Sequence, residues 1–337
     1  MAITPPTASA TDPLSAPSSA DRLLDGLSPG ASQPIDPVPT GFQPLDLILE
    51  GGFRPGELVL LGGNPGLGKT VALLQWARVA ARLCRPVAVV CYEHTERNLL
   101  RRLLVADVAE LAAGSVDRST MATIRHRIRD HVEGRITGAE LRETHPLAAA
   151  AMDRLRTDGP FLVLVRGSGV DTDLEALQRT VVDDLGAGGM LVVDYLQKVP
   201  DRAGSAASDP VRVAAGLKHL ALDHEVAVVA ASASGDDGLG SRRLRMGGLE
   251  GRSPMAHEAD LVLLLNSKAD IVSTLYTTYD PASVDDFAER VVLSVEKFRD
   301  GPAPVHLEFA KDLANYRFDP AGGFVGEKLV GEGLHDE

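Results

Sequence analysis

The feature that most constrains the fold is the glycine-rich run GGNPGLGKT at residues 62–70, which stands between an apolar segment and an amphipathic one. The run fits the pattern G-x-x-x-x-G-K-[S/T], with its fixed positions at Gly63, Gly68, Lys69 and Thr70. Glycines let backbone N–H groups turn inward around phosphate oxygens, and the N-terminus of a following helix adds partial positive charge. The run therefore predicts a phosphate-binding loop between a strand over 57–62 and a helix over 69–83.

The loop is expected to hold a nucleoside triphosphate through Gly63, Asn64, Pro65, Gly66, Leu67, Gly68, Lys69, Thr70 and Val71. Lys69 is expected to reach the β- and γ-phosphates, and the hydroxyl of Thr70 is expected to ligate Mg²⁺. ATP and Mg²⁺ are therefore the expected cofactors. A glycine-rich turn with a chance lysine is the alternative, and the strand-to-helix context argues against it.

Two carboxylates follow predicted strands at the edge where such a sheet binds ligands. Asp194 ends the apolar run over 190–195 and is expected to hold Mg²⁺, directly or through water; a strand-end aspartate that caps a turn is the alternative. Glu93 follows the strand over 86–92, which in a parallel sheet can lie beside the phosphate-loop strand. It is a candidate to orient the attacking water, and the pattern equally allows a surface glutamate that opens the next helix.

Strand-like apolar runs alternate with helical segments along most of the chain, which predicts a mostly parallel sheet covered by helices. Further strands are expected over 161–165, 226–232, 259–265, 290–298 and 305–310. Helices are expected within a charged region over 95–157, over 173–185 with Asp171 or Thr172 as the cap, and over 209–224.

Composition divides the chain into three segments. Residues 1–34 are rich in Pro, Ser and Ala and are expected to be disordered, with a short helix in the island ADRLLDGL left open. One ATPase domain is expected over 35–320. A flexible glycine-rich tail is expected over 321–337.

Charge and cysteine content limit the kinds of partner. The net charge of −13 argues against a protein that coats nucleic acid with its whole surface, but leaves room for a narrow basic channel. No apolar run reaches the roughly 18 residues of a membrane helix, and the N-terminus lacks a signal-peptide pattern. Cys84 and Cys91 lack metal-site spacing and are expected to be buried, reduced thiols. A cytoplasmic protein without membrane contact is expected.

Together these motifs resemble the C-terminal motor domain of the DnaB-type replicative DNA helicases, within the RecA-like ATPases, over most of residues 38–318. The resemblance rests on PTGFQPLDLILEGGFRPGELVLLGGNPGLGKTVALLQWA, VAVVCYEHTERNLLRRLL, GGMLVVDYLQKV with its Asp-Tyr-Leu-Gln run, HEADLVLLLN and SVEKFRDGP. It implies an α/β fold of the RecA-like P-loop NTPase class, with a mostly parallel twisted sheet flanked by helices and antiparallel strands at the C-terminal edge. It also places Glu93 at the position of the catalytic glutamate.

The resemblance gives a role to Lys297 and Arg299 in SVEKFRDGP. Family members carry Lys-x-Arg here on a β-hairpin that reaches the nucleotide of a neighbouring subunit. Two cations would neutralise the charge that develops on the γ-phosphate, and alternation along a strand puts both on one face. Two basic residues on an exposed strand are the alternative. Action on a neighbour implies a homo-oligomeric ring or filament built from heterologous contacts, and the family resemblance favours a hexameric ring with shared active sites.

The implied function is a Mg²⁺-dependent ATPase and 5′–3′ DNA helicase that acts on single-stranded DNA. Residues 238–252 fall where family members contact DNA, and the expected contacts are Arg242, Arg243, Arg245 and Arg252. A solvated charged loop is the alternative. Loader and primase partners are left open.

The sequence departs from the family pattern in three places, and two of them, Ala233 and the missing N-terminal domain, favour a second hypothesis, a nucleotide-gated assembly or regulatory ATPase without unwinding activity. The family's N-terminal primase-interacting domain is expected to be absent. Ala233 stands where the family usually carries a glutamine that senses the γ-phosphate, and Glu250 replaces a frequent arginine, with Arg252 nearby. A recombination ATPase of the RecA–RadA type is a third hypothesis, which the Asp-Tyr-Leu-Gln and Lys-x-Arg motifs disfavour.

Overall fold

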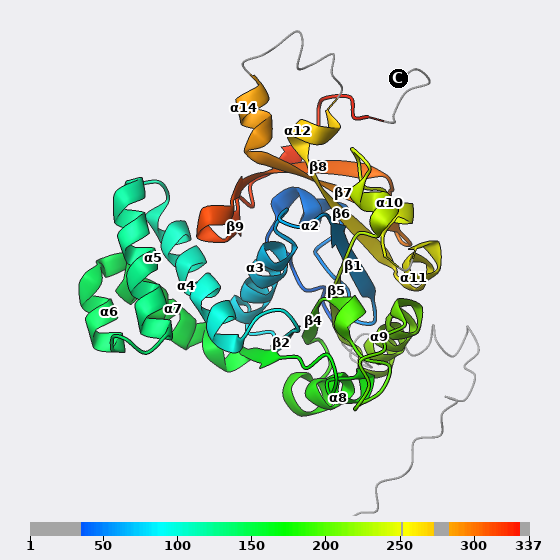
Figure 1. Cartoon of the computed structure of the whole chain (residues 1–337), viewed down its shortest axis with the longest axis horizontal. Coiled ribbons are helices and arrows are strands. Elements are labelled where there is room, and N and C mark those ends of the chain that lie inside the picture. The colour runs from blue at the N-terminus through cyan, green and yellow to red at the C-terminus, as the bar shows by residue number, and fades with distance from the viewer. Residues whose placement is uncertain (1–34, 251, 273–282, 331–337) are drawn as a thin grey trace, which may run out of the picture. The chain divides into compact units, whose positions relative to one another are not determined.

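The computed structural model of the chain describes residues 35–250, 252–272 and 283–330 (Figure 1). The predicted N-terminal segment over 1–34 lies outside these residues. All helices and strands given below belong to the unit that begins at Asp36.

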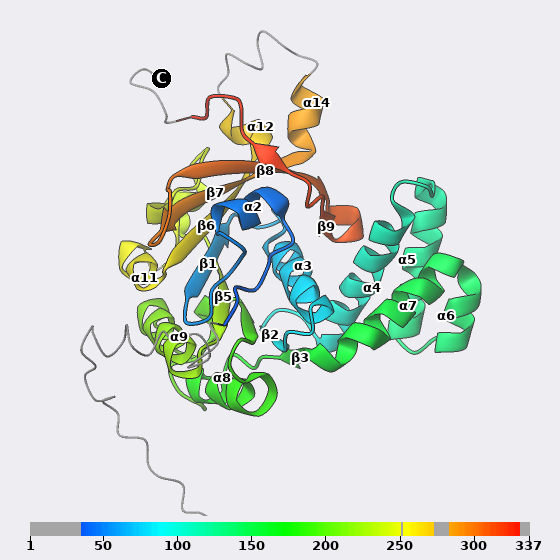
Figure 2. The same cartoon turned by 180° about the vertical axis from the view of Figure 1, so that it is seen from behind.

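Parallel strands form the centre of a ten-stranded sheet. They are β1 (Leu58–Gly63), β2 (Val87–Cys91), β3 (Leu162–Arg166), β4 (Met190–Asp194), β5 (Ala227–Ser232) and β6 (Leu261–Ser267). Across the sheet they lie in the order β6-β1-β5-β4-β2-β3 (Figures 1 and 2). The buried, aliphatic runs of β1, β2, β4 and β5 are typical of strands that are covered on both faces, whereas β3 at the end of the sheet is only partly buried.

Antiparallel strands continue the sheet beyond β6. β7 (Arg290–Phe298) pairs with β6 and with β8 (Val305–Asp312), and β8 pairs in turn with β9 (Arg317–Phe318) and β10 (Gly323–Phe324). The predicted fold class is therefore confirmed: the fold is RecA-like α/β, with a mostly parallel sheet and antiparallel strands at its C-terminal edge.

The first part of the predicted flexible tail differs from that expectation. β10 joins the sheet through β8, and Leu329 is fully buried. Lys268, which is buried at the start of α12 (Lys268–Ile271), forms an ion pair of 2.9 Å with Glu327. A strand pairing, a buried apolar side chain and a buried ion pair hold this stretch in place, and residues 331–337 lie outside the described part.

One face of the sheet is covered by α2 (Gln43–Ile48) and α3 (Lys69–Arg82). Trp76 of α3 lies fully buried between Phe53, at 5.2 Å between ring centroids and 74° between ring planes, and Phe42, at 5.8 Å and 69°. Edge-to-face arrangements of this kind suit the opposite charges of aromatic faces and edges. The helix that begins at the phosphate loop is thereby fixed to the sheet.

The other face is covered by α8 (Leu174–Thr180), α9 (Pro210–His224) and α11 (Arg252–Glu258). α8 continues as a π-helical turn over Val181–Leu185. Its N-cap is Asp173, whose carboxylate accepts from the backbone N–H of Ala176, so the predicted caps Asp171 and Thr172 are wrong by one or two residues. Two further short helices are α10 (Asp236–Leu239), between β5 and β6, and α14 (Ser283–Ala288), before β7.

The charged region after β2 forms a helical bundle of α4 (Glu96–Ala112), α5 (Arg118–Val132), α6 (Gly138–Thr144) and α7 (Pro146–Asp158). These helices share a hydrophobic cluster of their own, separate from the two clusters that flank the sheet. Both views show the bundle beside α3, on the side of the molecule away from α9 (Figures 1 and 2). In the described part of the chain, no helix combines the length and the apolar character needed to cross a bilayer.

Candidate functional site

The phosphate loop connects β1 to α3. Gly68 is the N-cap of α3 with φ of 96°, a left-handed conformation that glycine adopts without strain. A Cβ atom at Gly68 would lie 2.6 Å from Phe318 Cζ and 2.9 Å from Leu313 Cδ2, so a side chain does not fit. Among the described residues, no side chain caps α3, which leaves its first N–H groups free to meet a phosphate.

Lys69 is folded over this loop. Its Nζ donates to the carbonyl oxygens of Gly63 at 2.5 Å and of Asn64 at 3.3 Å. Burial lowers the pKa of the Lys69 ammonium, while the nearby carboxylates of Asp194 and Glu93 raise it. The ammonium is therefore held at the loop in a partly desolvated place, where a phosphate would be a strong partner.

Thr70 and Asp194 face one another at the first turn of α3. Thr70 Oγ1 donates to Asp194 Oδ2 at 2.7 Å, and the Asp194 side chain is almost fully buried. A hydroxyl and a carboxylate are hard oxygen ligands of the kind that Mg²⁺ prefers, and a nucleotide-borne Mg²⁺ needs only one or two such groups from the protein. The pair therefore fits that ion, although the described residues contain no cluster of three metal-ligating side chains.

Glu93 reaches the same site from a strand other than the expected neighbour. β2 does not lie beside β1, because β5 and β4 stand between them. β2 lies instead beside β4, with Cys91 opposite Asp194 in the register. The end of β2 therefore brings Glu93 to the same cavity as Asp194, and the Glu93 side chain is exposed.

One cavity of about 410 Å³ collects these groups. From the predicted set it is lined by Pro65, Gly66, Gly68, Lys69, Thr70, Val71, Glu93 and Asp194. Gly63, Asn64 and Leu67 do not line it, and Leu67 packs against the core beneath the loop. The structure thus gathers the predicted phosphate, metal and water-orienting groups in one place, and their roles stay predictions.

Arg102 and Tyr316 also line this cavity, and the sequence analysis did not identify them. The Arg102 guanidinium lies 5.2 Å from the centre of the Tyr316 ring and within 2.8 Å of His94 Nε2. Burial lowers the pKa of Arg102. The local pattern of α4 does not distinguish Arg102 from the neighbouring arginines, so only the tertiary structure selects it.

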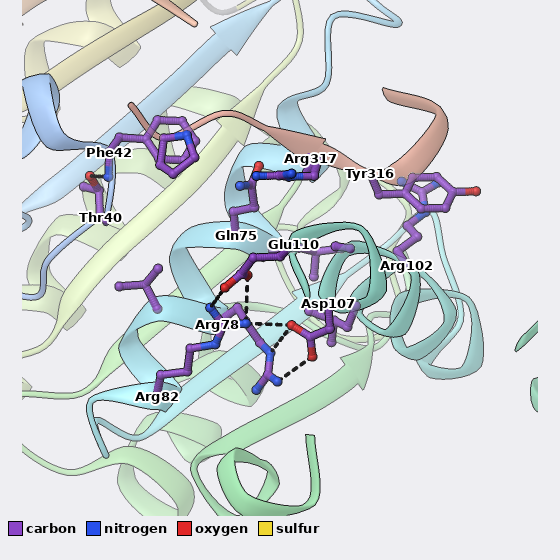
Figure 3. Close-up of a pocket in the computed structure, with 16 residues that line it drawn as sticks. Thr40, Phe42, Gln75, Arg78, Arg82, Arg102, Asp107, Glu110, Tyr316 and Arg317 are labelled. Carbon is purple, nitrogen blue, oxygen red and sulfur yellow. Dashed lines mark hydrogen bonds and ion pairs between the residues drawn. The ribbon is translucent and has the colours of Figure 1, made fainter. Parts of the chain in front are cut away.

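A second cavity of about 240 Å³ lies on the other side of Arg102 and Tyr316, which line both cavities (Figure 3). Its floor carries ion pairs between α3 and α4: Arg78 with Asp107 at 2.5 Å, and Arg82 with Asp107 at 2.7 Å. These contacts join the helix of the phosphate loop to the helical bundle.

Lys297 and Arg299 lie at the edge of the sheet where the parallel strands begin, whereas the phosphate loop lies at the edge where those strands end. Lys297 Nζ donates to the carbonyl oxygen of Ala259 at 2.6 Å, and Arg299 Nη2 donates to that of His257 at 2.8 Å, so both side chains reach the end of α11. That edge lies beside Leu58, where β1 begins. β1 is six residues long, which puts its two ends about 17 Å apart. Neither cation reaches the phosphate loop of its own chain.

Asp260 holds this distant edge together and was also missed by the sequence analysis. Its Oδ2 accepts from the backbone N–H of Leu58 at 2.8 Å and from Lys218 Nζ at 2.7 Å. Its Oδ1 lies 3.5 Å from Arg299 Nε. The carboxylate ties together the starts of β1 and β6, α9 and the predicted catalytic arginine. Its signal in the sequence is weak, a single aspartate before an apolar run.

The arginines predicted to contact DNA have different surroundings. Arg243 is buried, at 5% exposure, and donates to Val330 O at 3.0 Å, so its inclusion among the DNA contacts is wrong. Its guanidinium instead fastens the loop to the C-terminal stretch. Arg242 is exposed, and Arg245 is exposed while paired with Glu296 at 2.9 Å. The side chain of Arg252 lies outside the described residues.

Ala233, which has no polar side chain, lines the cavity of about 410 Å³ that is predicted to hold the nucleotide and is called the nucleotide cavity below. Gln197, from the Asp-Tyr-Leu-Gln run, lies next to it. Its Oε1 accepts from Ala233 N at 3.2 Å, and its Nε2 donates to Ser232 Oγ at 2.9 Å and to Glu250 O at 3.2 Å. The amide of Gln197 thus connects the end of β5 to the loop at Glu250, although Gln197 is not at position 233, where the family usually carries its sensor glutamine.

The chain matches a family model described as the DnaB-like helicase C terminal domain over residues 37–318. It is 27% identical over 274 residues to a replicative DNA helicase DnaB of Leifsonia xyli subsp. xyli, a match that covers 79% of this chain and 52% of that protein. It is 27% identical over 197 residues to a replicative DNA helicase DnaB of Nostoc sp., covering 58% of this chain and 20% of that protein. The chain therefore spans about half or less of the length of these relatives.

Among solved structures, that of a DnaB-like replicative helicase is similar with a TM-score of 0.65 and 19% sequence identity. The match covers 90% of this chain and 67% of that one. A solved structure described as an ATPase domain is similar with a TM-score of 0.66 and 20% identity, and covers 90% of this chain and 99% of its own. At this level of identity both similarities concern the fold alone.

Proposed function

The chain belongs to the DnaB-like helicase C-terminal domain family, and from this premise we propose that it is an ATP-hydrolysing motor that acts on single-stranded DNA. The observation that carries the proposal is the single cavity of about 410 Å³ in which Lys69, Thr70, Glu93 and Asp194 meet. These residues come from three strand ends that are far apart in the sequence. A chance glycine-rich turn would not be accompanied by two carboxylates at these places.

The proposed hydrolysis divides the work among these side chains. The free N–H groups of α3 and the Lys69 ammonium bind the phosphate chain. The oxygens of Thr70 and Asp194 hold Mg²⁺, which when bound adds positive charge beside the phosphates. The exposed carboxylate of Glu93 orients a water molecule toward the γ-phosphate and accepts its proton as the water attacks. Arg102 adds a guanidinium to the same wall of the cavity.

We further propose that Lys297 and Arg299 act on the nucleotide of a neighbouring copy. Both side chains reach the same place on α11, on the edge of the sheet opposite the phosphate loop. A contact between the phosphate-loop side of one copy and the Lys297 and Arg299 side of the next copy is heterologous, and such contacts form a ring when the rotation between copies closes. A hexameric ring, 5′–3′ movement on DNA and a cytoplasmic location are the finer parts of this proposal. Of the arginines predicted to contact DNA, the proposal keeps the exposed Arg242 and Arg245.

The proposal is tested by ATP hydrolysis of the purified chain with and without Mg²⁺ and single-stranded DNA. Hydrolysis is expected to require Mg²⁺, to rise with DNA and to vanish in Lys69→Ala. Glu93→Gln is expected to keep nucleotide binding and to lose about 10²–10⁴-fold in rate. Lys328→Ala, an exposed lysine outside the cavity, is the matched control. No hydrolysis under any of these conditions would remove the enzymatic proposal.

Ala233 favours one second candidate, an assembly ATPase that closes rings on nucleotide binding without unwinding DNA. Ala233 lines the cavity and has no side-chain donor to sense a γ-phosphate. A strand-displacement assay with a forked substrate separates the two functions. ATP-dependent displacement supports the motor, while nucleotide-dependent oligomerisation with no displacement supports the assembly ATPase.

A further inference from the structure

The helical bundle presents an arginine-rich surface that the nucleotide site does not use. Arg97 and Arg101 stand four residues apart on α4, and Arg125 and Arg129 stand four residues apart on α5. Residues with this spacing lie on the same face of a helix, about 6 Å apart along its axis. α4 and α5 pack against one another through the bundle's own hydrophobic cluster. We call these four residues the arginine strip.

Two neighbouring grooves run along the strip and share Arg101. One, of about 400 Å³, is lined by Arg101, Arg125, Arg129 and His126, with no carboxylate among its described lining residues. The other, of about 460 Å³, is lined by Arg97, Arg101 and one acid, Glu133. Glu133 is already paired with Arg135. The strip is therefore a concentrated positive surface on a chain with a net charge of −13.

Other arginines of the same bundle are neutralised by acids. Arg127 and Arg135 pair with Asp130, and Arg142 pairs with Asp153. By contrast, within the described ranges no strip arginine has a carboxylate at ion-pair distance; Arg125 donates to the amide oxygen of Asn315 at 2.8 Å, and Arg129 contacts His126 at 2.7 Å. These arginines therefore repel one another without a compensating charge, and a ligand of opposite charge would relieve that repulsion.

We propose that the arginine strip binds the sugar–phosphate backbone of a single-stranded nucleic acid, as a second track apart from the loop over 238–252. Its cations are all guanidiniums, whose planar fork matches phosphate oxygens. A protein partner would need large apolar anchors, and the described apolar residues of these grooves are small or few: Val105, Ala122, Val132, Ala314 and Tyr316. Phosphates need only the charges and the open grooves.

The 400 Å³ groove of the strip and the nucleotide cavity share one lining residue. Tyr316 lines both that cavity and the 400 Å³ groove, and the Arg101 guanidinium lies 5.6 Å from the centre of its ring. A strand in the groove and a nucleotide in the cavity would thus share one side chain. Binding to the strip does not itself require hydrolysis or a ring, so the inference stands apart from the proposed motor function.

The test is the fluorescence anisotropy of a labelled oligo-dT, titrated with the full chain over a range of salt concentrations and without nucleotide. Every protein carries Arg242→Ala and Arg245→Ala, which remove the proposed loop contacts. Each phosphate contact to a single strand contributes about 0.7 to the slope of log K against log salt. Arg125→Ala/Arg129→Ala is therefore expected to reduce the slope by about 1.4.

Arg127→Ala/Arg142→Ala is the matched control, because it removes the same charge from arginines that have acidic partners. It is expected to leave the slope unchanged. Because Arg125 also bonds Asn315, the exposed Arg97 provides a second probe, and Arg97→Ala is expected to reduce the slope by about 0.7.

Equal slopes for the strip variants and the control would overturn the proposal. Displacement of the oligonucleotide by poly-glutamate at comparable concentrations would also overturn it, and would identify the strip as a site for an acidic peptide. The assay contains no ATP. A chain that fails to hydrolyse ATP but shows the slope difference would therefore contradict the motor and support the strip.

Discussion

At the scale of single residues, the two cysteines differ in solvent exposure, and this difference determines how readily each thiol reacts. Both were expected to be buried, and this is wrong for Cys84, which is exposed just after α3. Cys91 is fully buried at the end of β2, where its Sγ donates to Asp194 Oδ2 at 3.6 Å. Burial, together with the negative charge of Asp194, raises the pKa of the Cys91 thiol to about 12.

The thiols should therefore react at different rates. At pH 8 a thiol of pKa about 12 is ionised to a fraction on the order of 10⁻⁴. We expect one rapidly titrated thiol per folded chain with a coloured disulfide reagent, and two after denaturation. Cys84→Ser should abolish the rapid reaction, whereas Cys91→Ser should leave it unchanged. A second rapid thiol in the folded Cys84→Ser variant would contradict the buried, proton-bound state of Cys91.

At the scale of elements, α3 links the sheet to the helical bundle through charges in addition to apolar contacts. Arg78 of α3 pairs with Asp107 of α4 and with Asp158 of α7, and the side chains of Arg78 and Asp107 are only 5% and 2% exposed. A buried pair is a weak source of net stability, but removing one partner leaves a charge without compensation.

Asp107→Ala leaves Arg78 with Asp158 as its remaining acidic partner, so it should destabilise the protein by up to about 3 kcal/mol in the free energy of unfolding, the lower end of the range for breaking a buried pair. The matched control is Asp153→Ala, which removes an acid from the solvent-exposed pair with Arg142 in the same bundle and should change stability little. Urea unfolding followed by the fluorescence of Trp76, the single tryptophan, measures both. Similar unfolding midpoints for the two variants would show that the α3–α4 pair is not needed to hold the bundle.

At the scale of the whole molecule, the two groups of proposed catalytic residues lie on opposite edges of one sheet. Lys69, Thr70, Glu93 and Asp194 gather at the carboxyl ends of the parallel strands. Arg299 stands where those strands begin, held by Asp260 and a carbonyl oxygen of α11. The proposed catalytic set therefore does not come together within one chain, and the shared-site proposal calls for two copies.

Mixing variants tests this sharing directly. Arg299→Ala alone should lose about 10³-fold or more in ATP hydrolysis, and Lys69→Ala alone should be inactive. An equal mixture should recover activity, because a Lys69→Ala copy can donate its Arg299 to the intact loop of its neighbour. Lys69→Ala mixed with Glu93→Gln should stay inactive, since both changes damage the same half of the site. A mixture that recovers nothing in either case would contradict shared sites.

The sequence by itself determined the local pieces. The strand, glycine-rich loop and helix around Lys69 follow from short-range rules: glycine freedom, helix polarity and apolar runs of strand length. The alternation of such runs gave the mostly parallel sheet, and Asp194 could be placed at a strand end because its carboxylate closes an apolar run. The resemblance to a known family added the prediction of antiparallel strands at the C-terminal edge and of a catalytic role for Arg299.

Only the tertiary structure decided which distant pieces meet. Sheet order is set by packing between segments far apart in the chain, so the sequence did not show that β2 lies beside β4 and that Glu93 and Asp194 line one cavity. The same long-range packing buries Arg243, places no described carboxylate at ion-pair distance from the arginine strip, and adds Arg102 and Tyr316 to the nucleotide cavity. One arginine looks like another in sequence, since its role depends on which charges the fold brings within a few ångströms of it.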